Sequence, residues 1–515
     1  MRKLIILFLF LFSSLHANDW KTRTLYSSLD QSSISDAFAF YKLYPKSDYG
    51  KRALERAFFL INKHRVLPIT LSSQLHLPKF HIQGMISLVN KMANDETPKL
   101  SERQIHQIEL ICDHLKNRKL KGHSITEIEQ IDDLKLEELD LARALLLHEF
   151  KDSETRMHDI RQYEANIDLM ALQVMARLHR NASNLEKIKA INHFIFHEMR
   201  FRFPPQSISN KEIDTFTFLP SVLDSRLGVC LGVSVLYLTI AQRIGLDLEI
   251  ITPPGHIYLS YTDVDGEQHN IETTARGIHV PEEHYFGINT LELKHRNIRE
   301  TIGLSFFNQA SVLWERERHA EAVELYKKAE IYMADEPLVK LFMGLNQLFI
   351  GEEEAAKENL AYVKSHPMAH VIFQDTMSDD YLNGRATPEG LKAIFKQVDE
   401  TRSSIFEKQK QIQTILKSSP KFREGWFHLA VTWLQLSRLK EAKGALEKYH
   451  ALDPTNPTVE YYLSMINMER YDYEKAFDHL KRTYQLVGEH EHQKKILKGI
   501  RFGLNLINPK YTLPN

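Results

Sequence analysis

The sequence contains very little cysteine and no excess of either charge. Only Cys112 and Cys230 occur in 515 residues, and 66 lysines and arginines nearly match 67 acidic residues, which leaves a net charge of -1. A chain with this balance has no general electrostatic attraction to nucleic acids or to anionic membranes. We therefore predict no nucleic-acid partner. The two cysteines allow at most one disulfide, and that pairing stays open because oxidising compartments join thiols.

Long apolar runs are missing as well. Nine apolar residues at 4–12 follow Arg2-Lys3 and precede the segment Ser13-Ser14-Leu15-His16-Ala17. A membrane-spanning helix needs about 20 apolar residues, so this run is typical of an export signal and not of a stable anchor. We predict a signal peptide over 1–17 and a periplasmic or secreted chain without a stable transmembrane segment. Leu15 is larger than the residue preferred before a cleavage site, which leaves an uncleaved form open.

The short-spaced motifs of metal sites are absent too. Among 25 histidines there is no His-Glu-x-x-His, and the two cysteines do not form Cys-x-x-Cys. We expect His256 and His269 to face each other across a hairpin, but no short-spaced partner completes a site. No metal and no cofactor are predicted.

The length of the chain exceeds what one hydrophobic core organises, so two to four domains are expected. Apolar residues at steps of three and four predict a helical N-terminal region over 18–137. Its clearest helices are 78–94 and 101–117, the second opening with a capping box at Ser101. The same spacing predicts helices at 139–150, 160–179 and 184–199. The default role of the N-terminal region is that of a scaffold.

One stretch carries the residue types of thiol catalysis in a suitable order. Gly228-Val229-Cys230 opens an apolar helix that ends at Gly245, and His256 and Glu272 follow. Strands are predicted at 248–252, 256–262 and 268–273, and the turn Asp263-Val264-Asp265-Gly266 predicts a hairpin between the last two. A thiol at a helix start, a histidine and an acid are the nucleophile, base and orienting group of a cysteine enzyme.

The C-terminal half repeats small residues at a spacing of 34. The pairs are Ala310 and Gly344, Ala322 and Ala356, Ala430 and Ser464, and Ala442 and Ala476. A large residue follows each second small residue by four positions: Tyr326, Leu360, Leu446 and Leu480. We predict repeats 1–2 over 303–367 and repeats 3–4 over 421–490. Between them, 368–420 is a divergent helical segment with a charged helix at 390–417.

The pattern of small and large residues resembles the tetratricopeptide repeat. The stretch around Cys230 resembles the transglutaminase-like superfamily, in a bacterial branch that is often joined to such repeats. The resemblance rests on Gly228-x-Cys230, on Ala241-Gln242-Arg243-Ile244-Gly245-Leu246 and on Pro254-Gly255-His256, and it covers 138–290. Glu272 stands where the family usually has aspartate, and members of this branch often carry proline in place of Cys230.

The resemblance implies a fold that is mainly α with a small α+β core. A helical N-terminal region precedes a transglutaminase-like domain with antiparallel strands and a C-terminal α-solenoid of repeats. It also implies a papain-type site of Cys230, His256 and Glu272. The dipole at the helix start favours the Cys230 thiolate. His256 takes the proton, Glu272 orients the His256 ring, and the Cys230 N–H stabilises an oxyanion.

Two functions follow from these features. The first is an exported cysteine-dependent amide or acyl hydrolase or transferase, acting through a thioester, whose repeats bind a protein or peptide partner. The alternative is a non-catalytic interaction scaffold that retains an inactive transglutaminase-like fold. Taken singly, a buried cysteine is more often an inert core residue, and a histidine after Pro-Gly is often a turn residue.

Overall fold

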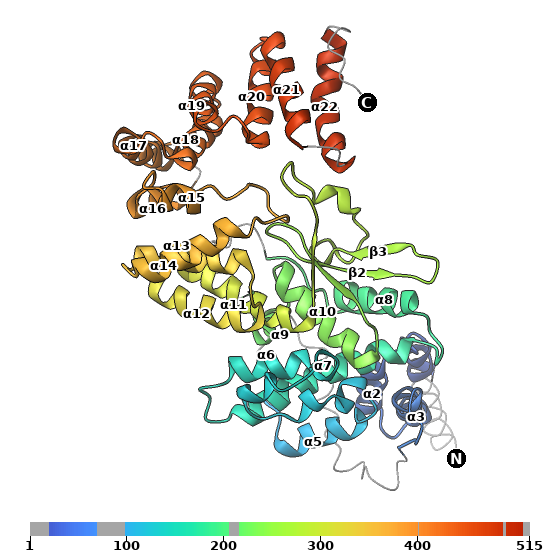
Figure 1. The fold of residues 1–515 in the computed structure, drawn as a ribbon. Coiled ribbons are helices and arrows are strands. Elements are labelled where there is room, and N and C mark those ends of the chain that lie inside the picture. The colour runs from blue at the N-terminus through green and yellow to red at the C-terminus, as the bar shows by residue number, and fades with distance from the viewer. Residues whose placement is uncertain (1–19, 70–97, 205–215, 400, 488–490, 508–515) are drawn as a thin grey trace, which may run out of the picture. The chain divides into compact units, whose positions relative to one another are not determined.

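The computed structural model describes residues 20–69, 98–204, 216–399, 401–487 and 491–507 (Figure 1). The predicted signal peptide at 1–17 and the predicted helix at 78–94 lie outside these residues. The chain divides into two compact units. The first comprises residues up to 250 with 258–279 and 297–299, and the second comprises 251–257, 280–296 and the residues from 300 onward. The fold is mainly helical with one small sheet, as the sequence predicts.

The first unit opens with helices whose starts are defined by serine caps. Ser33 and Ser47 precede α2 (Ile34–Leu43) and α3 (Asp48–Asn62), and each accepts a backbone N–H in the first turn. The predicted capping box at Ser101 opens α5 (Glu102–Ile111), with the Ser101 N–H donating to Gln104 Oε1 at 2.8 Å. The helix ends six residues earlier than predicted, because the backbone leaves helical geometry at Cys112. Short 3-10 turns follow, at η2 (Lys116–Lys119), η3 (Lys121–Ser124), η4 (Ile128–Ile131) and η5 (Leu136–Glu138).

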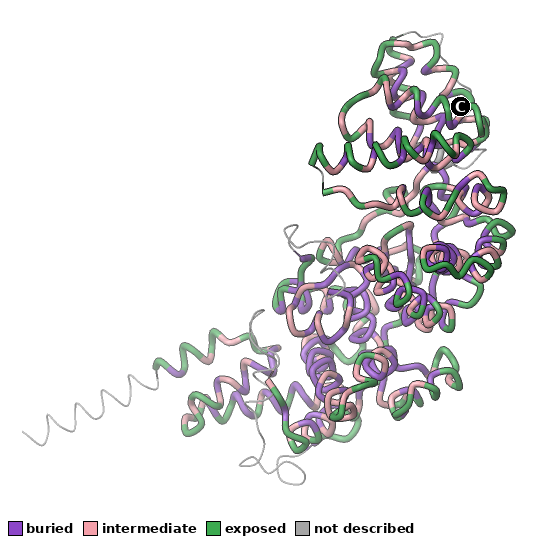
Figure 2. The backbone as a smooth tube through the Cα atoms, turned by 90° about the vertical axis from the view of Figure 1, so that its left-hand side faces the viewer, coloured by how far each residue is buried: buried purple, intermediate pink, exposed green. Residues whose placement is uncertain are grey.

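The core of the first unit lies around two helices, α7 (Arg156–Arg177) and α10 (Cys230–Ile244). Every residue of α10 from 231 to 241 is buried. Buried residues are drawn in purple in Figure 2. Helices that pack near them are α6 (Leu141–Glu149), α8 (Asn184–Asn192) and α9 (Leu219–Ser225). The predicted helix at 184–199 is confirmed, except that its end is a π-helical turn, η6 (His193–Glu198).

The sheet has four short strands in the order β3-β2-β1-β4. They are β1 (Glu249–Thr252), β2 (Tyr258–Thr262), β3 (Gln268–Ile271) and β4 (Lys294–Arg296). The predicted hairpin is confirmed, with β2 and β3 antiparallel and Gly266 at φ 82° in the turn. The expectation that His256 faces His269 is wrong, because Tyr261 lies opposite His269.

The second unit is built of stacked helix pairs. The first pairs are α11 (Ile298–Glu315) with α12 (His319–Tyr332) and α13 (Pro337–Phe349) with α14 (Glu353–Ser365). The later pairs are α18 (Arg423–Gln435) with α19 (Leu439–Leu452) and α20 (Pro457–Glu469) with α21 (Tyr473–Val487). The repeated small and large residues other than Gly344 are each at most 1% exposed. The repeated small and large residues therefore lie where the paired helices pack against each other.

The segment between the two sets of repeats is helical, but its predicted long helix at 390–417 is wrong. The structure has α15 (Met377–Leu382), α16 (Pro388–Phe395) and α17 (Arg402–Ser418) instead. The interruption has a local cause, since Thr401 caps α17 by accepting the Ser404 N–H. A further helix, α22 (Glu491–Ile507), follows the last pair and packs on α21.

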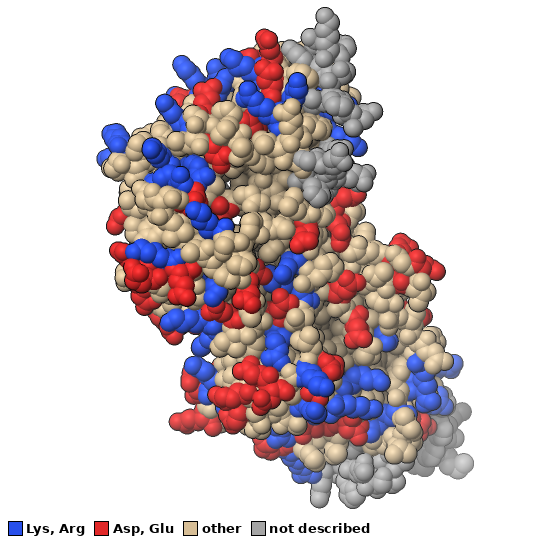
Figure 3. Space-filling view, viewed as in Figure 1, with Lys and Arg blue, Asp and Glu red and all other residues tan. Residues whose placement is uncertain are grey.

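Within the described residues, no helix has the length and apolar character that a membrane span requires. Lysines and arginines are interspersed with acidic residues over the face shown in Figure 3. This mixture agrees with the near-zero net charge.

Candidate active site

Cys230 is the first residue of α10, where a Gly-x-Cys-x-Gly turn enters the helix. The glycines on either side allow close packing. A Cβ on Gly228 would lie 2.6 Å from a side-chain methyl group of the next turn, and one on Gly232 would lie 2.2 Å from the carbonyl oxygen of Phe216. That same carbonyl accepts the Val229 N–H at 3.1 Å. The start of α10 is therefore fixed against residue 216, and the position of Cys230 is fixed with it.

The two cysteines have different environments, and both are free thiols. Cys230 is half-buried at the start of α10. Cys112 is fully buried, and burial, with the nearby Asp168 carboxylate, raises the pKa of its thiol well above the ordinary value. The structure therefore contains no Cys112–Cys230 disulfide, and only Cys230 is placed to react with a solute.

Glu272 follows the end of β3 and is 5% exposed. It caps the 3-10 turn η8 (Thr273–Ala275), because its Oε1 accepts the Thr274 N–H at 3.0 Å and the Thr274 hydroxyl at 2.5 Å. The predicted strand at 268–273 is therefore shorter than expected, and Glu272 lies in the turn after it. The Glu-x-Thr motif explains this conformation, since the third residue supplies both donors.

The link between this turn and α10 is made by Thr273. Its hydroxyl lies 3.0 Å from the Ser234 hydroxyl and 3.5 Å from the carbonyl oxygen of Cys230. Glu272 is thereby held beside the first turn of the cysteine helix. The sequence analysis did not single out Thr273 or Ser234, although Ser234 lies one helical turn after Cys230 and Thr273 adjoins Glu272.

His256 lies in the second unit, in a turn two residues before β2. Its N–H donates to the Pro253 carbonyl at 3.0 Å, and Gly255 has φ 72°. Proline and glycine at the two central positions are the signature of a type II turn. The ring stacks on Tyr285 with centroids 5.6 Å apart and an angle of 17°. The predicted strand at 256–262 therefore begins later than expected, and the pairing of His256 with Cys230 stays a prediction.

The far end of α10 is anchored by a buried ion pair. The Arg243 side chain is 0% exposed, and its Nε donates to Asp168 Oδ1 on α7 at 2.6 Å. Arg118 binds the other oxygen of Asp168, so two guanidinium groups share one carboxylate. A buried charge is tolerated only with such partners. The sequence motif around Arg243 therefore serves to hold the cysteine helix in place.

Two clusters contain the residue types of a metal site, but protein partners explain both. In the first, Asp140 and Glu164 lie within 3.9 Å of His123. Arg143 binds Glu164 through two contacts of 2.7 Å, which balances its charge. In the second, Asp263 accepts two backbone N–H groups of the hairpin turn and binds His269 at 2.9 Å. Neither arrangement requires a cation.

Residues 161–297 match the model of a family described as the transglutaminase-like superfamily. The chain carries a transglutaminase-like domain. The matched residues include Cys230, His256 and Glu272. No curated protein matches the chain.

The solved structures similar to the chain include a TPR protein and several structures of MamA. A thermophilic TPR protein of Thermus thermophilus is 12% identical, with 39% of this chain and 99% of that chain covered and a TM-score of 0.23. MamA of Desulfovibrio magneticus RS-1, from residue 41 to its end, is 17% identical over 36% of this chain and 94% of that chain, with a TM-score of 0.18. TM-scores this low do not define a fold. The assignment of tetratricopeptide-type repeats rests on the helix pairs and their buried small residues.

Proposed function

We propose that the protein is an exported enzyme that transfers or hydrolyses acyl groups through a thioester on Cys230. The observation that carries the proposal is the half-buried free thiol at the first residue of α10, inside the transglutaminase-like match. The thiolate attacks the carbonyl carbon of an amide or ester, and the amine or alcohol leaves with a proton. Water or an amine then attacks the thioester and regenerates the thiol.

The other candidate residues are assigned the roles expected of a papain-type site. His256 accepts the thiol proton and returns it to the leaving group. The Glu272 carboxylate orients the imidazole, and the Cys230 N–H stabilises the negative oxygen of the tetrahedral intermediate. The contact of Thr273 with Ser234 supports this assignment, because it holds Glu272 near the start of the cysteine helix.

The repeats and the signal peptide complete the proposal. Paired helices with buried small residues build extended surfaces that bind peptides, so the second unit is assigned a protein or peptide partner. The basic and apolar residues at 1–12 support export.

The alternative function is a non-catalytic interaction scaffold, and one contact favours it. Glu272 Oε1 is already engaged by the Thr274 N–H and hydroxyl, which is a structural role that needs no imidazole. In this alternative the domain retains the fold and the repeats carry the function.

Acylation by 4-nitrophenyl acetate separates the two functions. An enzyme releases a burst of nitrophenolate equal to one acyl group per chain, and mass spectrometry locates the acetyl group on Cys230. The acetyl group then turns over to water, or faster to added hydroxylamine. Cys230→Ser is expected to lose the burst, and Cys112→Ser is expected to keep it. No burst, or an equal burst in Cys230→Ser, supports the scaffold.

A further inference from the structure

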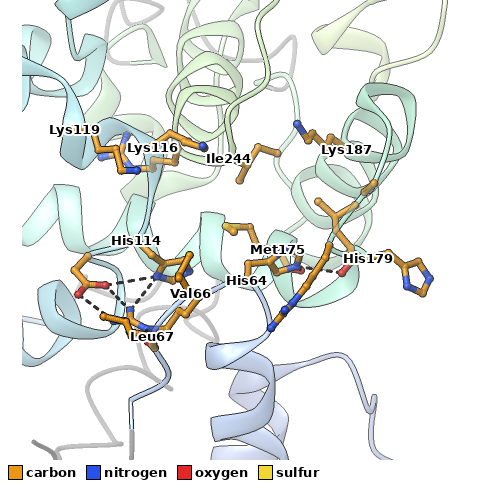
Figure 4. Close-up of a pocket in the computed structure, with 16 residues that line it drawn as sticks. His64, Val66, Leu67, His114, Lys116, Lys119, Met175, His179, Lys187 and Ile244 are labelled. Carbon is orange, nitrogen blue, oxygen red and sulfur yellow. Dashed lines mark hydrogen bonds and ion pairs between the residues drawn. The ribbon is translucent and has the colours of Figure 1, made fainter.

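A cavity of about 510 Å³ lies in the first unit at the C-terminal end of α10 (Figure 4). Its volume is in the range of small-molecule binding sites. Arg243 and Ile244 from the last turn of α10 contribute to its lining, whereas Cys230 begins the same helix. The helix rises about 1.5 Å per residue, so the fourteen steps from Cys230 to Ile244 separate the two ends by about 21 Å. The cavity is therefore separate from the candidate active site.

The lining of this cavity is strongly cationic. One carboxylate, Asp113, faces six basic groups: Arg65, Lys116, Lys119, Arg180, Lys187 and Arg243. Arg65 binds Asp113, with Nη2 to Oδ2 at 3.0 Å, and Arg243 binds Asp168. In the part of the chain that the structure describes, the other four form no ion pair with a carboxylate. Exposed lysines elsewhere do so readily, as Lys327 does with Glu324 at 2.9 Å.

The short helix η2 and two side-chain hydrogen bonds hold these four cations at the cavity. Lys116 and Lys119 are the ends of η2, and residues three apart in a 3-10 helix lie on one face. Figure 4 shows both beside Ile244, with Lys187 on its other side. Lys187 Nζ donates to the Gly245 carbonyl at 2.9 Å, and Arg180 Nε donates to the Lys63 carbonyl at 2.6 Å.

A purely structural role explains part of this charge and not all of it. The cavity lies at the C-terminal ends of α7 and α10, and cations are stabilised there by the helix dipole. Each helix end carries only about half a negative charge. Two such ends and the Asp247 carboxylate, which acts on Lys187, together balance about two of the four positive charges, so a positive field remains in the cavity.

Burial is the main cause that lowers the pKa of basic groups in and around the cavity. It lowers the pKa of Lys187, where the charge of Lys116 adds to the effect and the Asp247 carboxylate opposes it. Burial likewise lowers the pKa of His114 to about 4, with a contribution from Arg65 that Asp113 opposes. The pKa of His64 is lowered by burial, with contributions from Lys63 and Arg180. Burial therefore disfavours the protonated forms here, and the neighbouring cations add to that effect.

We propose that this cavity binds a small organic polyanion with at least two phosphate or carboxylate groups. Lys116 and Lys119 contact anionic groups on one side of Ile244, Lys187 contacts them on its other side, and Arg180 supplies a fourth cation of the lining. The ammonium groups act as point charges, and the Arg180 guanidinium offers a planar fork. Met175, Leu178 and Ile244 line the same cavity and accept the uncharged part of the ligand.

Calorimetric titration of the full chain tests this proposal with inorganic tripolyphosphate and with citrate as probes. At least one probe is expected to bind, and to bind more weakly as the salt concentration rises. Binding of tripolyphosphate alone assigns the site to phosphates, and binding of both shows that carboxylates suffice. Failure of both probes to bind at low salt overturns the proposal.

Charge variants distinguish binding in this cavity from nonspecific electrostatic attraction of the probe to the protein surface. The double variant K116Q/K119Q removes two exposed charges and is expected to weaken binding at least about tenfold, whereas K116R/K119R is expected to retain it. Lys189→Gln is the matched control, because Lys189 is exposed on the same helix as Lys187 and does not line the cavity. Binding that survives K116Q/K119Q, or that Lys189→Gln weakens equally, contradicts the assignment. A melting temperature equal to that of the natural chain, measured for each variant without probe, shows that the variant is folded.

Discussion

The hydroxyl groups of Thr273 and Ser234 lie 3.0 Å apart and join the turn after β3 to the first turns of α10. Both residues are buried, with 3% and 0% of their surface exposed. Cys230 and Glu272 belong to segments that are far apart in sequence, and this contact brings the segments together. The geometry of the candidate site therefore depends on two residues that take no part in the proposed chemistry.

Removal of one of these hydroxyls is expected to destabilise the first unit. Thr273→Val keeps the shape but leaves the buried Ser234 hydroxyl without this partner, which costs about 1–3 kcal/mol of unfolding free energy. Urea unfolding followed by circular dichroism measures the change. The double variant S234A/T273V removes both polar groups and is expected to be more stable than the sum of the single effects predicts. If the free-energy changes of the two single variants add up to that of the double variant, the two hydroxyls do not interact.

The buried ion pair at the other end of α10 is expected to contribute more. Asp168→Asn leaves Arg243 and Arg118 without a carboxylate, which costs about 3–5 kcal/mol. Cys112 is fully buried near Asp168. Its rate of reaction with a disulfide reagent in the native protein therefore measures how far the packing around Asp168 opens in the variant. Asp159→Asn is the matched control on the same helix, because the Asp159 carboxylate accepts hydrogen bonds from the hydroxyls of Ser153 and Thr155 and forms no ion pair within the described residues. Equal Cys112 reactivity in both variants would contradict the anchoring role.

Glu424, whose side chain is 13% exposed, is expected to make the repeats in the second unit less stable as pH rises. Burial, with Asp375 and Asp380 nearby, raises the pKa of Glu424 from 4.5 to about 7. The folded state therefore holds the proton more tightly than the unfolded state, so stability present below pH 4.5 is lost as pH rises to about 7. Glu424→Gln keeps an acceptor for the Thr376 hydroxyl, which lies 2.6 Å from Glu424 Oε1. We expect this variant to gain about 1–3 kcal/mol at pH 8 and little at pH 4.

Tryptophan fluorescence measures this effect in the appropriate part of the chain. Three of the four tryptophans, Trp314, Trp426 and Trp433, lie in the second unit. The midpoint of urea unfolding is compared for the natural chain and the variant at the two pH values. The gain in unfolding free energy of the variant over the natural chain is then compared between pH 8 and pH 4. An equal gain at both pH values would show that ionisation of Glu424 does not destabilise the folded state.

Local signals predicted those parts of the structure that are determined by neighbouring residues. The glycines at 228 and 245 bound α10, Asp263 and Gly266 define the hairpin, and the spacing of 34 locates the helix crossings. The gap between α16 and α17 also had a local signal, because Thr401 is a good cap three residues before Ser404.

Long-range pairs left no such signal. Arg243 and Asp168 are 75 residues apart in sequence, and neither lies in a motif that indicates the other. The cationic cavity likewise combines separate segments that each look like an ordinary solvated surface. Glu272 shows a different limit: the Glu-x-Thr motif is a local signal, but the residue was interpreted as an orienting acid and its contact with Thr274 was not predicted.

The rate at which iodoacetamide alkylates Cys230 in the native chain at pH 7 tests the central claim most directly. Peptide mass mapping separates Cys230 from Cys112, which is the internal control because it is fully buried. We predict rapid modification of Cys230, slow modification of Cys112, and a clearly slower reaction of Cys230 in His256→Ala, because the proton acceptor is lost. A Cys230 thiol that reacts as slowly as Cys112, or at the same rate with and without His256, would contradict a catalytic cysteine.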